Sequence, residues 1–116
     1  MSGITIFHNP GCSTSRAILA TIRESGAEPK IVEYLKTPPS RAELKALLKR
    51  AGLTVREILR KRAPPYAELG LDNPALTDAQ LLDAIEAHPV LIERPIVATP
   101  KGVRLCRPKE RLAEIL

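Results

Sequence analysis

A chain of 116 residues that is 44% hydrophobic and 27% charged has the size and composition of one folded domain, so we expect a single domain over residues 1–116. Its net charge of +5 is compatible with nucleic acid, an acidic protein or a small anionic substrate. Aromatic residues make up 3% of the chain and the basic residues are scattered, which disfavours a protein that stacks bases on aromatic rings, and we expect no nucleic-acid partner.

The sequence has no apolar run of the ~20 residues that a membrane span needs, and no basic segment followed by an apolar stretch at its start. We therefore expect a cytoplasmic protein with no membrane partner. Two cysteines, Cys12 and Cys106, are too few for a disulfide framework or a four-cysteine zinc site, and no metal site is expected. In a reducing compartment, each cysteine is either a small core residue or a reactive thiol.

The first third of the chain alternates strand, helix and strand. Residues 3–7 are apolar and β-branched, which predicts a buried strand, and residues 9–11 form a turn of Asn, Pro and Gly. Apolar residues at helical spacing predict a helix over residues 13–25, and residues 30–34 read as a second strand. Cys12 is thus expected in the loop between a strand and the start of a helix.

The middle of the chain carries three capping-box patterns, in which Ser or Thr is followed three residues later by Glu or Gln. Each pattern precedes an apolar stripe at helical spacing, so it predicts the start of an amphipathic helix. The predicted helices run from Ser40 to Gly52, from Thr54 to Pro64–Pro65, and from Thr77 to His88–Pro89.

The last third of the chain predicts a β-hairpin and a closing helix. Residues 96–99 and 103–106 are strand-like and joined by a tight turn, which favours antiparallel pairing, and Pro108 suits the first turn of a helix that runs to Leu116. The complete order is β-α-β, a helical block, then β-β-α. It predicts an α/β fold with a mixed four-stranded sheet flanked by helices, as in a thioredoxin-like domain with a helical insertion.

Several features around Cys12 favour its thiolate. A helix start offers free N–H groups and the positive end of the helix dipole, Ser15 can donate a hydrogen bond, and His8 can carry a positive charge. The alternative is a small buried residue that happens to precede a helix. Ser15 stands where a Cys-x-x-Cys motif would have its second thiol, which argues against dithiol cycling within the loop.

The run His8–Arg16 closely resembles the active-site loop of the glutaredoxin-coupled arsenate reductases. The likeness extends over nearly the whole chain. It continues through Tyr34-Leu35, Pro38-Pro39-Ser40, Tyr66, Leu69-Gly70-Leu71, Arg94-Pro95-Ile96-Val97 and Leu105-Cys106-Arg107-Pro108.

The resemblance implies an oxidoreductase that reduces arsenate to arsenite and serves arsenical resistance. It implies that Cys12 is the nucleophile, that His8 and Ser15 stabilise its thiolate, and that glutathione and glutaredoxin are the reductants, with no bound cofactor. It also implies that three arginines hold the oxyanion: Arg60, Arg94 and Arg107.

The three arginines can also be judged from their own positions. A guanidinium suits an oxyanion because its planar fork donates two parallel charge-assisted hydrogen bonds. Taken alone, Arg60 in a basic triplet at a helix end could compensate the helix dipole, and Arg107 could be a surface charge. Arg94 directly before an apolar strand is an unusual place for a charge unless it lines a site.

Two further expectations concern Pro95 and Cys106. Thioredoxin-like folds carry a cis proline before the third strand, facing the active cysteine, so this resemblance implies a cis Arg94–Pro95 peptide bond. Cys106, at a strand end, is expected to be a core residue, with a resolving thiol as the alternative.

Two other classes of protein remain open. A thioredoxin-like regulator that binds RNA polymerase would not need the three arginines, and many such proteins have a second cysteine where this chain has Ser15. A general glutathione-dependent thiol oxidoreductase would need Cys12 but not the arginines.

Overall fold

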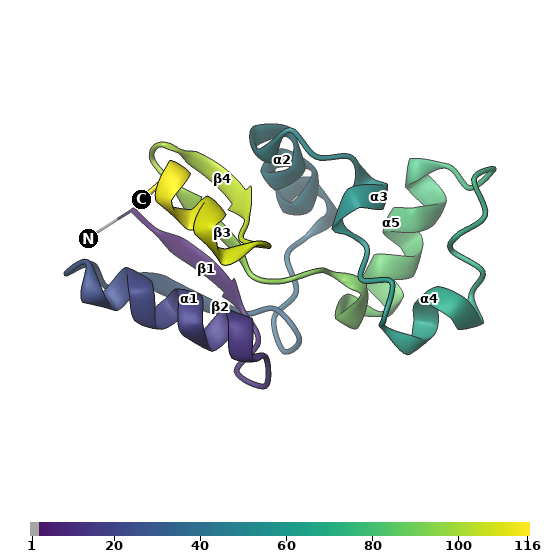
Figure 1. Cartoon of the computed structure of the whole chain (residues 1–116). Coiled ribbons are helices and arrows are strands. Elements are labelled where there is room, and N and C mark those ends of the chain that lie inside the picture. Colours follow the sequence, from purple (N-terminus) through teal and green to yellow (C-terminus); the bar gives the residue numbers. More distant parts are fainter. Residues whose placement is uncertain (1–2) are drawn as a thin grey trace. The chain divides into compact units, whose positions relative to one another are not determined.

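The computed structural model describes residues 3–116, and the chain divides into two compact units (Figure 1). The first unit comprises Met1–Pro38 together with Arg94–Leu116, and the second comprises Pro39–Glu93. The second unit contains helices and lies in the sequence between the second and third strands. It is the helical insertion that the order of predicted elements indicates.

The first unit contains a mixed four-stranded sheet in the order β2-β1-β3-β4. Strand β1 (Thr5–His8) pairs in parallel with β2 (Lys30–Glu33) and antiparallel with β3 (Ile96–Thr99), which pairs antiparallel with β4 (Gly102–Leu105). The predicted α/β class, mixed sheet and C-terminal hairpin are confirmed.

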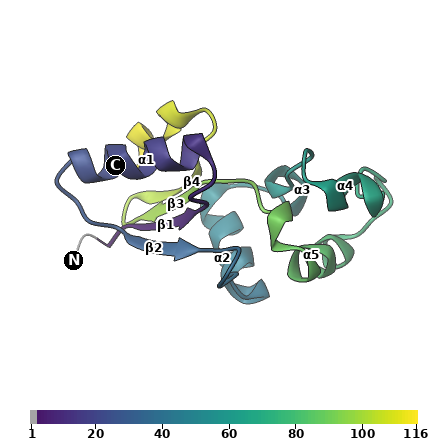
Figure 2. The same cartoon turned by 90° about the horizontal axis from the view of Figure 1, so that it is seen from below.

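Helix α1 (Ser13–Glu24) and a short 3-10 helix, η2 (Lys109–Glu114), lie on one face of this sheet (Figure 2). Alternate residues of a strand point to the same face of the sheet, and the residues of β1 and β3 that face α1 pack against the apolar side of this helix. The resulting core is aliphatic, as the scarcity of aromatic residues predicts. It comprises Ile4, Ile6, Ile18, Leu19, Ile22, Val97, Cys106, Leu112 and Ile115.

The closing helix differs from the prediction. The sequence favours a helix from Pro108 to Leu116, whereas the structure has a six-residue 3-10 helix with Pro108 at its N-cap and no side-chain capping bond. The Thr99 hydroxyl donates to the carbonyl of Ile115 at 2.7 Å, so it provides a hydrogen-bond partner for a carbonyl at the end of this helix. The 3-10 geometry is typical of short helical pieces such as this one.

The second unit contains α2 (Arg41–Ala51), α3 (Val55–Ile58), α4 (Pro64–Glu68), α5 (Asp78–Ala87) and the 3-10 helix η1 (Pro89–Leu91). All three predicted capping boxes form, with both reciprocal hydrogen bonds present at the starts of α2, α3 and α5.

The prediction that two prolines end α3 is wrong. Helix α3 already ends at Ile58, and Leu59 is extended and forms a β-bridge with Ile92. Pro64 and Pro65 instead begin α4. Proline suits the first turn of a helix because the N–H groups there have no intrahelical acceptor.

Candidate active site

The loop after β1 places Cys12 at the start of α1. The Cys12 N–H donates to the Asn9 carbonyl at 3.0 Å, and the Gly11 N–H donates to Asn9 Oδ1 at 2.9 Å, which closes a tight turn. The Arg16 guanidinium, from the second turn of α1, donates to the Pro10 carbonyl at 2.8 Å. Cys12 is thereby held as the extended N-cap residue of α1, with its side chain 6% exposed.

The surroundings of Cys12 favour its thiolate. Burial raises the pKa of the thiol, but the Ser15 N–H and the guanidinium groups of Arg94 and Arg107 outweigh burial and leave the pKa below its usual value. Arg107 Nη2 donates to Cys12 Sγ at 3.8 Å. A lowered pKa increases the fraction of nucleophilic thiolate at neutral pH.

Arg94 and Arg107 are brought to Cys12 by the ends of β3 and β4. Arg94 is 9% exposed and precedes Pro95, and the peptide bond between them is cis, as the resemblance implies. Arg107 Nε donates to the Arg94 carbonyl at 2.7 Å, which orients its guanidinium. A second cis peptide bond, Arg107–Pro108, was not predicted.

His8 and Ser15 form a buried pair beside the cysteine loop. His8 Nδ1 and Ser15 Oγ are 2.6 Å apart, and the Asn9 N–H donates to the same Oγ at 3.1 Å. Ser15 therefore acts on the sulfur of Cys12 through its backbone N–H, while its hydroxyl is engaged by His8. Burial lowers the pKa of His8 more than nearby Glu33 raises it, which favours the neutral imidazole at pH 7.

Arg60 lies in the second unit, in the segment that follows α3. Its N–H donates to the Leu91 carbonyl at 2.7 Å, and its side chain is half-buried. The structure thus brings together Cys12, Arg94 and Arg107 within the first unit, whereas Arg60 belongs to the helical unit. The role of Arg60 stays a prediction.

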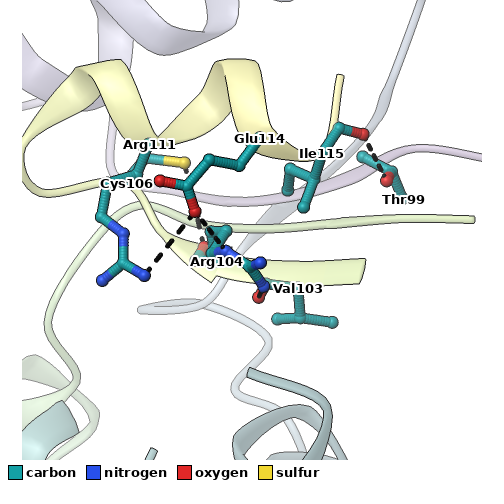
Figure 3. A network of polar contacts seen from close by, with 7 residues as sticks. All are labelled: Thr99, Val103, Arg104, Cys106, Arg111, Glu114 and Ile115. Atoms are coloured by element: carbon teal, nitrogen blue, oxygen red, sulfur yellow. Dashed lines mark hydrogen bonds and ion pairs between the residues drawn. The ribbon is translucent and has the colours of Figure 1, made fainter. Parts of the chain in front are cut away.

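Cys106 has surroundings of a different kind. Its side chain is 0% exposed and belongs to the core, and burial raises the pKa of its thiol to about 11. The thiol donates weakly to the Arg104 carbonyl at 3.9 Å (Figure 3). These observations favour the interpretation of Cys106 as a core residue.

The sequence reasoning missed the contribution of Asn9, whose side chain and backbone both close the turn before Cys12. The Asn-Pro-Gly turn signal was present, but it did not indicate which group would accept the hydrogen bonds. It also missed Glu33, which adjoins His8 only through the pairing of β1 with β2.

Over residues 3–116, no three His, Cys, Asp or Glu side chains gather in a way that could hold a metal ion. In the same part of the chain, none of the helices has the length and apolar character needed to cross a bilayer.

Comparison with known proteins gives this site a context. A family profile described as ArsC matches residues 7–115. The arsenate reductase of Rhizobium meliloti (strain 1021) is 58% identical over 113 residues, which cover 97% of this chain and 81% of that protein. The arsenate reductase of Escherichia coli (strain K12) is 56% identical over 116 residues, which cover 100% of this chain and 82% of that protein.

The fold agrees with these matches. The solved structure of the arsenate reductase from Vibrio cholerae superposes with a TM-score of 0.92 at 44% identity, covering 97% of each chain. With the family profile spanning almost the whole sequence and relatives above 50% identity, the chain belongs to the ArsC family.

Proposed function

We propose that this protein is an arsenate reductase in which the Cys12 thiolate attacks arsenate. The observation that carries the proposal is the convergence of Arg94 and Arg107 on the sulfur of Cys12, at the start of α1. Two guanidinium groups beside a thiolate attract and orient a second anion, which would otherwise be repelled by the sulfur. The relatives named arsenate reductase supply the identity of that anion.

In the first step, the sulfur of Cys12 forms a bond to arsenic and one arsenate oxygen leaves as water after it gains protons. Arsenic remains pentavalent in this covalent ester. The arginines hold the other oxygens by charge-assisted hydrogen bonds and keep arsenic close to the sulfur, so the protein contributes positioning and charge stabilisation.

Reduction needs two electrons, which two thiols supply when they join as a disulfide. We assign these thiols to glutathione and glutaredoxin, because Ser15 replaces a second thiol in the loop and Cys106 is buried with a raised pKa. The thiol of glutathione displaces a second arsenate oxygen as water and binds arsenic through its sulfur. The glutaredoxin thiolate then attacks that sulfur, so the glutathione–glutaredoxin disulfide forms and the electron pair of the broken sulfur–arsenic bond reduces arsenic to the trivalent state. Water finally displaces the sulfur of Cys12 from arsenic, which releases arsenite and returns Cys12 to the free thiol. The scheme uses no bound cofactor, and the reducing cytoplasm suits it.

Arg60 is proposed as a third oxyanion ligand on the strength of the family resemblance. It occurs in the run Arg60-Lys61-Arg62, in which Lys61 and Arg62 are exposed. Substitution of Arg62 therefore provides a matched control, because it removes the same positive charge two residues away from Arg60. If Arg60 binds arsenate, Arg60→Ala raises the KM for arsenate and Arg62→Ala leaves it unchanged.

The test is arsenate-dependent NADPH oxidation in a mixture with glutathione, glutaredoxin and glutathione reductase. We expect activity that requires every component and is lost in Cys12→Ser. Reduction of a mixed disulfide with glutathione, without any arsenate-dependent rate, would point to a general thiol oxidoreductase. A protein inactive in both assays that binds RNA polymerase would point to a regulator.

A further inference from the structure

His8 and Glu33 stand opposite each other in the parallel pair of β1 and β2. Ile6, two residues before His8, is a core residue beneath α1, and alternate residues of a strand share a face. His8 therefore lies on the face that α1 covers, where its ring meets Ser15. Glu33, as the register partner of His8, lies on the same face, and neighbouring strands are about 4.8 Å apart.

Charged groups act on His8 from both elements packed against it. Glu33 on β2 raises the pKa of His8, whereas burial and, from α1, Arg23 and Arg16 lower it. On the other side, Phe7 pairs with Ile96 at the start of β3, so the position opposite His8 is Pro95, which carries no charge. Among these groups, Glu33 is the one acidic side chain.

Glu33 is itself modulated by a neighbour. Lys36 Nζ lies 3.5 Å from Glu33 Oε1, and both side chains are substantially exposed. An exposed ion pair of this kind is weak, so it leaves much of the carboxylate charge able to act on His8.

Resting on the proposed function, we propose that Glu33 is a positioning residue for Cys12: its carboxylate increases the fraction of His8 that is protonated, and protonated His8 releases the Ser15 hydroxyl to donate to the sulfur. A hydroxyl has one hydrogen to donate and two lone pairs to accept with. Ser15 Oγ accepts from the Asn9 N–H, and we assign to neutral His8 the tautomer with its hydrogen on Nε2, in which Nδ1 accepts the hydrogen of the Ser15 hydroxyl.

When His8 gains a proton at Nδ1, the direction of this hydrogen bond reverses. Ser15 Oγ then accepts from both Asn9 and His8, and its hydrogen is free to turn elsewhere. Ser15 is the third residue of α1 and Cys12 is the N-cap. The backbone N–H of Ser15 already acts on the sulfur of Cys12, so the freed hydroxyl hydrogen of the same residue can turn toward that thiolate.

The experiment measures the rate at which iodoacetamide alkylates Cys12 between pH 5 and pH 8, followed by mass spectrometry of its peptide. We expect Glu33→Gln to slow alkylation by roughly two- to fivefold at pH 6 and to leave it unchanged near pH 8, where His8 is neutral in both proteins. NMR of the His8 ring should show its protonation moving to lower pH.

Two variants sharpen the test. Lys36→Gln frees the Glu33 carboxylate and should move both measurements in the opposite direction. Glu110→Gln removes an equal charge from an exposed residue of η2 that is not among the groups acting on His8, and should change neither.

A double-mutant comparison separates this proposal from a general charge effect. In a His8→Gln protein, Glu33→Gln should no longer alter the alkylation rate. An equal slowing with and without His8, or an unmoved His8 titration in Glu33→Gln, would overturn the proposal. Neither readout uses arsenate, so a failure here is distinct from a failure to reduce arsenate.

Discussion

The two cysteines of the first unit are both shielded from water, yet their thiols are shifted in opposite directions. Cys12, at the N-cap of α1, is 6% exposed and has a lowered pKa. Cys106, at the end of β4, is 0% exposed and has a pKa raised to about 11. Burial disfavours the thiolate at both sites, so burial alone does not decide which cysteine becomes a nucleophile.

Both cysteines also have two arginines nearby, and the difference lies in what those arginines face. Arg104 and Arg111 near Cys106 meet the carboxylate of Glu114, at 2.8 Å and 3.8 Å (Figure 3). This carboxylate raises the pKa of Cys106 and opposes the two guanidinium groups. Beside Cys12, the guanidinium groups act together with a backbone N–H, and no carboxylate is among the groups that shift its pKa.

The largest effect should come from Cys12 itself. A serine hydroxyl at this position is not ionised near neutral pH and cannot form the covalent ester at a useful rate, so Cys12→Ser should abolish arsenate-dependent NADPH oxidation. Circular dichroism should show an unchanged fold. Retention of more than a few per cent of the activity would exclude Cys12 as the nucleophile.

The next effect should come from the arginines at the sulfur. Arg94→Ala or Arg107→Ala should lower kcat/KM for arsenate by roughly ten- to a thousandfold, as for the loss of one or two charge-assisted hydrogen bonds. Lysine at either position should restore only part of the loss, because a point charge does not replace the planar fork. Arg62→Ala, an exposed arginine of the helical unit, serves as the control and should have normal kinetics.

The comparison of the two thiols can be measured directly. In the folded protein at pH 7, iodoacetamide should modify Cys12 at least about a hundredfold faster than Cys106, since the pKa and the access of the two thiols both differ. In urea, the two rates should converge. Similar rates in the folded protein would mean that the two environments are not chemically distinct.

Local sequence was enough to predict elements whose signals lie within a few residues. The capping boxes at Ser40, Thr54 and Thr77 satisfy their helix starts with side chains three residues away, and all three form. The two wrong predictions, at Pro64–Pro65 and in the closing helix, both concern prolines, and proline is compatible with more than one local structure. Proline both ends helices and begins them, and the choice depends on the surrounding packing.

The candidate active site likewise has some features that local sequence predicts and others that depend on distant parts of the chain. The position of Cys12 at a helix start follows from the turn before it and the apolar spacing after it. Its contact with Arg107, 95 residues along the chain, depends on how β4 pairs in the sheet, and only the family resemblance indicated it beforehand. The placement of Glu33 opposite His8 depends on strand register, which the residues of either strand do not specify alone.

The smallest effect on activity, and the most specific test of the comparison, should come from Cys106→Ala. Activity should stay within about twofold of wild type, because the thiol is buried and protonated at neutral pH. Loss of the sulfur from the core should cost about 1 kcal/mol of unfolding free energy at pH 7. A complete loss of activity in a folded protein would instead assign Cys106 a catalytic role.

The stability of this variant should also differ in its dependence on pH. In the unfolded chain, a Cys106 thiol loses its proton near pH 9, whereas burial keeps the folded thiol protonated until the pH nears its raised pKa of about 11. Between these values the unfolded state binds fewer protons, so wild-type stability should fall as pH rises, by up to about 2 kcal/mol. Urea unfolding of wild type and Cys106→Ala from pH 8 to pH 10.5 isolates the contribution of the Cys106 thiol. The two proteins have the same Lys and Tyr residues, so the contributions of those residues cancel in the comparison. The advantage in unfolding free energy that wild type has over Cys106→Ala at pH 7 should therefore shrink as pH rises and reverse towards pH 10.5, and parallel curves would show that burial does not hold the proton on Cys106.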